Sequence, residues 1–170
     1  MLFGRRKTAG TIFDQHYKSM LNITKSTAIA QNPKFELLPA MFIIVDYAAA
    51  SCGKDRREIA SAIMAEINSI DKNLDKTVFD RRCALYGEII RGRDLRCEWF
   101  MGDHAAFNDN AISKCTALLG DILYNPDCAD NYDNAPVMLY GIIDAMSFTE
   151  TVMKPLLRES VELFKDIYNL

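Results

Sequence analysis

The five cysteines of this sequence include no pair with the C-x-x-C spacing that is typical of zinc sites and redox motifs. Their odd number also leaves at least one thiol unpaired in any intramolecular disulfide scheme. Small secreted domains commonly depend on disulfide frameworks, so this pattern favours a reducing compartment. We therefore expect a cytoplasmic protein.

No apolar run in the chain reaches the roughly 20 residues that a membrane-spanning helix requires. The longest run, 37–47, is shorter and contains Asp46. The N-terminus is basic, but the apolar segment of a signal peptide does not follow it. We expect no membrane insertion, and we interpret residues 1–10 as a flexible basic arm in front of a single domain over 11–170.

Motifs of the common enzyme classes are absent as well. The chain has no glycine-rich phosphate loop, no nucleophile elbow, no zinc-binding H-E-x-x-H and no dinucleotide-binding fingerprint. The acidic stretch 127–133 alternates oxygen ligands, yet it lacks the central glycine and the final glutamate of an EF-hand. We therefore predict no metal and no cofactor, and we favour a binding role over catalysis.

Helical periodicity is what the sequence does contain. Of its 170 residues 49% are hydrophobic and 25% charged, which is typical of one globular domain. Apolar residues follow the spacing of amphipathic helices, so the sequence predicts an all-α, compact bundle of six to seven helices. We expect helices at 11–31, 39–51, 55–70, 77–91 and 103–125, from 136 onward, and from 155 if Pro155 starts a new helix rather than kinking the sixth. The expected N-caps are Thr11, Asp55, Thr77 and Asp103.

Two of these segments, about 39–51 and 136–147, are apolar on nearly all sides, and helices of this kind lie at the centre of a bundle. Each contains one acid within its apolar run, Asp46 in the first and Asp144 in the second. A buried carboxylate needs a hydrogen bond, a cation or a bound proton, because it has lost its hydration. His16 lies on the apolar side of the first predicted helix.

If these three helices are neighbours, His16, Asp46 and Asp144 converge on one polar pocket. Tyr47 or Tyr140 would then lie beside them. Such a pocket could hold a small molecule or a metal ion, or act as an acid–base pair. We favour the alternative that each is a core polar residue satisfied by a tyrosine or an arginine, because metal sites in bundles usually show Glu-x-x-His pairs and this sequence has none.

Arginine is concentrated in residues 81–96, together with aromatic rings. Guanidinium groups near aromatic rings can bind phosphate, so this stretch is the best polyanion site in the sequence. Acidic residues interrupt it throughout, and we favour a salt-bridged surface or a docking surface for the acidic part of another copy. The candidate residues are Arg81, Arg82, Arg91, Arg93, Arg96 and Trp99.

The net charge of −3 conceals a gradient along the chain. Residues 1–51 carry +3, residues 52–100 carry +1 and residues 101–170 carry −7. This balance gives no general attraction for nucleic acid, but it can orient a partner or a second copy. Methionine and aromatic residues suit adaptable interfaces. We therefore interpret the chain as a helical interaction or scaffold domain that forms a homodimer.

Overall fold

The computed structural model describes residues 7–93, 95, 110–133 and 142–170, and these residues form helices and connecting turns with no β-strand among them. The predicted all-α bundle is confirmed. No helix in the described ranges combines the length and the apolar character that a membrane span requires. The elements are α1 (Ala9–Thr24), α2 (Pro33–Ser51), α3 (Arg56–Ile70), α4 (Lys76–Ile90), α6 (Ala111–Tyr124), the 3-10 turn η1 (Pro126–Ala129), α7 (Ile142–Phe148), the π-helical turn η2 (Thr149–Met153) and α8 (Lys154–Tyr168).

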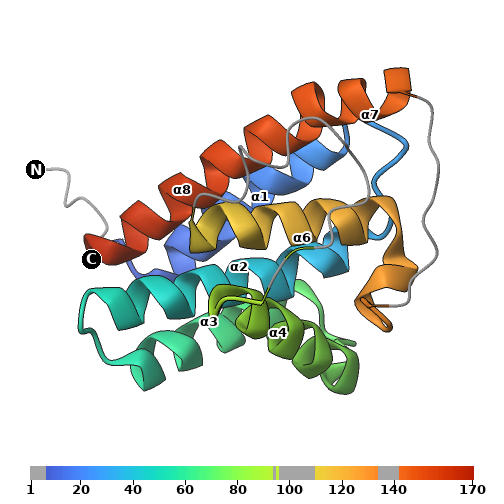
Figure 1. Cartoon of the computed structure of the whole chain (residues 1–170). Helices are drawn as coiled ribbons and strands as arrows, with labels where there is room; N and C mark the ends of the chain where they lie inside the picture. The colour runs from blue at the N-terminus through green and yellow to red at the C-terminus, as the bar shows by residue number, and fades with distance from the viewer. Residues whose placement is uncertain (1–6, 94, 96–109, 134–141) are drawn as a thin grey trace, which may run out of the picture.

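The hub of the bundle is α2, because its side chains are apolar on almost every side. It packs against α1, α3, α4, α6 and α8 (Figure 1). Leu37, Leu38, Met41 and Ile44 are almost completely buried in these contacts. The position that the sequence predicts for this apolar helix, at the centre of the bundle, is therefore correct.

The start of α2 differs from the prediction, since the helix begins at Pro33 rather than at Pro39. Asn32 adopts a left-handed conformation with φ of 44°, and Pro33 follows in the first turn. A proline there loses no helical hydrogen bond, because the first N–H groups of a helix have no intrahelical acceptor. The Asn32-Pro33 pair therefore starts this helix, in addition to separating it from the previous one as predicted.

Both ends of α1 also lie earlier than predicted. Its cap is Thr8, whose hydroxyl accepts a hydrogen bond from the Thr11 N–H at 3.2 Å, while the Thr11 hydroxyl accepts one from the Thr8 N–H at 2.9 Å. This reciprocal capping box begins the helix at Ala9, inside the predicted arm. The helix ends at Thr24 rather than near Gln31, and the hydroxyls of Thr24 and Ser26 donate to carbonyls of its last turn.

The remaining caps are aspartate and asparagine side chains. Asp55 caps α3 as predicted, and its carboxylate accepts from the backbone N–H groups two and three residues later. Asp75 caps α4 in place of Thr77, two residues earlier. Asn110 caps α6, and the predicted cap Asp103 lies outside the described residues. Because Asn110 is extended and α6 begins only at Ala111, the single unbroken helix predicted over 103–125 is wrong.

Residues 142–168 follow one helical path whose hydrogen bonding changes in the middle. In η2 the Lys154 N–H donates to the carbonyl of Thr149, five residues earlier. Pro155 has no N–H, and in a regular α-helix its ring would collide with the carbonyl of Thr151. The π-turn of η2 widens the helix at this point, so Pro155 fits in the first turn of α8 without a break in the helical path.

The second enclosed helix among the described residues is α6. Nearly every side chain from Ile112 to Tyr124 is buried, because α2, α4 and α8 surround this helix (Figure 1). Residues 136–141 of the predicted helix 136–147 lie outside the described residues. In the part that is described, Asp144 and Met146 are exposed. The expectation that Asp144 is buried in a central helix is therefore wrong.

Candidate functional site

The imidazole of His16 is buried between α1 and α8. Its Nδ1 lies 2.7 Å from Glu159 Oε1 and its Nε2 lies 3.0 Å from Asp166 Oδ2. Only a doubly protonated ring can donate to both carboxylates, since these oxygens are acceptors when ionised. Both acids belong to α8, two turns apart. His16 therefore joins two helices and is not directed toward Asp46 or Asp144.

Asp46 is paired with the residue that opens α3. Its two carboxylate oxygens accept from Arg56 Nε at 3.0 Å and Arg56 Nη2 at 2.5 Å. These hydrogen bonds raise the pKa of the Arg56 guanidinium above its ordinary value. The pair ties α2 to α3 at a partly exposed position.

The structure does not bring His16, Asp46 and Asp144 into one polar pocket. His16 and Asp46 have separate partners, Asp144 is exposed on α7, and Tyr140 lies outside the described residues. Among the described residues, no group of three or more histidine, cysteine, aspartate or glutamate side chains has an arrangement that could hold a metal ion. Of the predicted set, Asp46 and Tyr47 line a groove on another side of α2.

Arg82 is a structural residue in the interior. Its Nε donates to Glu36 Oε2 at 3.1 Å and its Nη1 donates to Asp130 Oδ1 at 3.0 Å. Burial raises the pKa of Glu36 even though Arg82 opposes this shift, so loss of hydration is the dominant effect on that carboxyl. The three side chains connect α2, α4 and the segment that follows η1.

Arg93 and Arg81 bind the same acidic segment of the chain, residues 130–133. Arg93 contacts Asp133 at 2.6 Å and lies over the Tyr132 ring, 5.4 Å from its centroid. Arg81 approaches Asp130 at 3.7 Å. The predicted arginine cluster is thus largely neutralised from within the molecule, which weakens its interpretation as a polyanion site. Arg96 and Trp99 lie outside the described residues.

Arg91 is different, because no described carboxylate lies within ion-pair distance of it. Its guanidinium lies along α4 over Gly87, where an added β-carbon would be 3.4 Å from Arg91 Nη1. The absence of a side chain at Gly87 lets this cation lie close to the helix. Among the described residues, Arg91 therefore carries an uncompensated positive charge at the edge of a groove.

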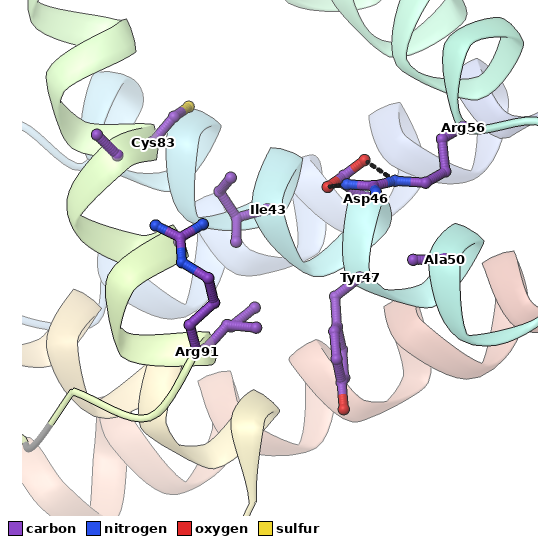
Figure 2. Close-up of a pocket in the computed structure, with 10 residues that line it drawn as sticks. Ile43, Asp46, Tyr47, Ala50, Arg56, Cys83 and Arg91 are labelled. Carbon is purple, nitrogen blue, oxygen red and sulfur yellow. Dashed lines mark hydrogen bonds and ion pairs between the residues drawn. The ribbon is translucent and has the colours of Figure 1, made fainter.

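This groove lies between α2 and α4 and has a volume of about 350 Å³. Figure 2 shows Ile43 and Tyr47 on the α2 side, Arg91 on the α4 side and the Asp46–Arg56 pair at one end. We call it the α2–α4 groove. Its lining residues are Ile43, Asp46, Tyr47, Ala50, Arg56, Cys83, Ala84, Gly87, Ile90 and Arg91.

The chemistry of the α2–α4 groove is that of a binding surface. Its walls combine aliphatic side chains such as Ile43 and Ile90 with charged ones. Asp46 compensates the charge of Arg56, so Arg91 determines the sign of the net charge in the groove. Burial, with a smaller contribution from Asp80, raises the pKa of the Cys83 thiol to about 12. At neutral pH this sulfur is a protonated thiol and not the thiolate that nucleophilic catalysis requires.

A second hollow lies on the other side of Tyr47, among α2, α6 and α8. The ring of Tyr47 packs against Phe164 with centroids 5.8 Å apart, and Phe164 stacks on Tyr168 at 5.9 Å. A row of three aromatic rings therefore leads from the α2–α4 groove to the end of α8.

Sequence reasoning found Tyr47 and Arg91 but assigned them to two different candidate sites. It missed Ile43, Cys83 and Ile90, which are ordinary apolar residues of amphipathic helices. One local signal was present, since Gly87 in the middle of α4 precedes Arg91 by one helical turn. Comparison of the chain with protein-family models, curated proteins and solved structures found no match in any of the three.

Proposed function

We propose that this chain is a protein-interaction domain that self-associates and that binds its partner through the α2–α4 groove. The observation that carries the proposal is the Arg91 guanidinium, unpaired among the described residues, beside the apolar side chains of Ile43, Tyr47 and Ile90. A matching surface must supply apolar side chains next to negative charge. Complementary charge of this kind gives an interface its orientation and its specificity.

A protein partner fits this groove better than a polyanion. Binding to nucleic acid depends on several uncompensated cations along one face. Here Arg81, Arg82 and Arg93 are all within ion-pair distance of acids of the same chain. A single free guanidinium in an apolar setting instead suits one carboxylate on an otherwise apolar segment.

We also propose that the protein acts in the cytoplasm. The support is the state of the thiols, since Cys52, Cys83 and Cys115 form no disulfide. Free cysteines are the usual state in a reducing compartment. Localisation of a tagged full-length chain by microscopy and fractionation tests this part, and recovery with secreted material would contradict it.

Light scattering coupled to size exclusion tests the proposed self-association. The wild-type chain should form a dimer as its concentration rises from about 10 µM toward about 1 mM. The dimer should weaken when the salt concentration rises from about 0.05 M to about 0.5 M, because added ions screen the interfacial charge.

Arg91→Glu should raise the dissociation constant by roughly tenfold or more, because it places a negative charge where the partner is acidic. Lys34→Glu is the matched control, since Lys34 is exposed at the other end of α2. A monomer at every concentration, or equal effects of the two substitutions, would overturn the proposal.

A further inference from the structure

We infer that the α2–α4 groove of one copy receives the end of α8 from a second copy, with Tyr168 and Leu170 as the apolar anchors. This inference rests on the proposed function and names the partner segment. It predicts a dimer with twofold symmetry in which each copy contributes one groove and one helix end.

The first argument is the exposure of large apolar side chains. Tyr168 is 45% exposed and Leu170 is 42% exposed, and the other such side chain among the described residues is Met146. Two of these three residues therefore lie together at the end of α8. The groove offers the aliphatic walls of Ile43 and Ile90 that two such side chains need.

The second argument is charge. From residue 159 onward α8 carries Glu159, Glu162 and Asp166 against the single cation Lys165. His16 pairs with Glu159 and Asp166, and Lys7 approaches Asp166 at 4.0 Å, so among the described residues Glu162 is the acid of this helix end whose partner belongs to α8 itself. Glu162 is 57% exposed and is held by an equally exposed lysine one turn away. A carboxylate of this kind can exchange its partner for the Arg91 of another copy at little cost, because surface ion pairs are weak.

The third argument is position. In Figure 1 α2 and α8 run in the same direction, and the contact between Tyr47 and Phe164 places their last turns side by side. The groove and the exposed end of α8 therefore belong to one continuous surface, joined by the aromatic row of Tyr47, Phe164 and Tyr168. A twofold interface uses the same surface on both copies, so a surface that carries both complementary parts can pair with itself and close.

Photo-cross-linking tests which segment enters the groove. Tyr168 is replaced by p-benzoylphenylalanine, which keeps an aromatic ring at this position, and the irradiated dimer is mapped by mass spectrometry. Cross-links should join residue 168 of one copy to residues 43–56 or 83–91 of the other. The same replacement at Met146, which is also exposed, should give no cross-link to these residues.

A charge exchange gives a second, independent readout. Arg91→Glu should weaken the dimer, and adding Glu162→Lys should restore at least half of the lost affinity on a logarithmic scale, because the attraction is rebuilt with its signs reversed. Glu150→Lys is the matched control. Glu150 is also an exposed glutamate paired with a lysine of the same helical path, but it lies in η2. It should restore nothing.

The outcomes separate this inference from the proposed function. A dimer sensitive to Arg91→Glu whose cross-links from residue 168 lie outside the groove would overturn the inference and leave the proposed function standing. Equal cross-linking from positions 146 and 168, or equal rescue by the two glutamate substitutions, would also overturn it. A wild-type monomer at all concentrations would overturn both.

Discussion

Individual residues in this protein differ in role according to how many partners they have, and not according to residue type. Arg82 and Arg91 both belong to the α4 segment, yet Arg82 is buried between Glu36 and Asp130 while Arg91 faces a groove with no described acid in ion-pair reach. His16 is likewise fixed by two carboxylates of α8. Side chains whose hydrogen bonds are satisfied within the molecule hold the helices together, whereas Arg91 is the cation on which our proposed interface depends.

At this scale we predict that His16→Gln destabilises the fold. A glutamine can replace only one of the two hydrogen bonds, so one of the carboxylates Glu159 and Asp166 loses its partner on α1. The free energy of unfolding, measured by urea denaturation, should fall by about 1–3 kcal/mol. Lys18→Gln is the control, because Lys18 is exposed on the same helix, and it should change stability by less than about 0.5 kcal/mol. Equal effects of both substitutions would contradict the bridging role.

At the scale of elements, the connections between helices depend on buried polar contacts as well as on apolar packing. The Glu36–Arg82 pair links α2 to α4, and Asp130 adds the segment after η1. A buried ion pair gives little net stability against an apolar replacement, but removal of one partner leaves an uncompensated charge in the interior.

We therefore predict that Arg82→Met costs about 3–5 kcal/mol of folding free energy. The double substitution Glu36→Leu with Arg82→Met should recover most of this loss, since it removes both charges. Thermal and urea unfolding of the two variants measure the difference. If the double variant is no more stable than Arg82→Met, the loss does not come from the unpaired carboxylate.

Substitutions of Gly87 in α4 allow effects on folding stability to be distinguished from effects on dimer formation. Its backbone is helical, and a β-carbon there would meet only the flexible end of Arg91. Gly87→Ala should therefore stabilise the fold by roughly 0.5–1 kcal/mol, because alanine has the higher helix propensity.

Gly87→Leu should leave the protein folded but fill the groove and displace Arg91. The dimer should then weaken by roughly tenfold or more. Circular dichroism monitors the fold and light scattering monitors the dimer in the same samples. A folded Gly87→Leu variant that still dimerises normally would show that the groove is not part of the dimer interface.

At the scale of the whole molecule, the burial of weak acids makes the fold less stable at alkaline pH. Burial raises the pKa of the Cys115 thiol from 9.0 to about 12 and raises the pKa of the Tyr86 phenol in the same direction. These groups ionise more readily in the unfolded chain than in the folded one. The unfolded state therefore loses protons first as the pH rises, and the fold becomes less stable.

We predict that the free energy of unfolding falls between pH 9.0 and about 12. Each such thiol contributes at most about 1.4 kcal/mol per pH unit within this window. Cys115→Ala should reduce the slope relative to the wild type, although it creates a cavity and lowers stability at neutral pH. Urea denaturation at several pH values measures the slope, and an unchanged slope in Cys115→Ala would contradict the role of this thiol.

The sequence by itself determined the all-α class, because helical periodicity and capping are local properties of consecutive residues. Asp55 is recognisable as a cap from its neighbours in the sequence alone. The side chains of α2 are apolar on nearly all sides of the helix, and this pattern predicts its central position. Tertiary structure decided which polar groups meet. Asp46 and Arg56 pair across the turn between α2 and α3, and Arg82 reaches Asp130 from a distant part of the chain. Such pairs depend on the packing of helices, which periodicity does not encode. The α2–α4 groove arises for the same reason, since a groove is the space that two packed helices leave between them.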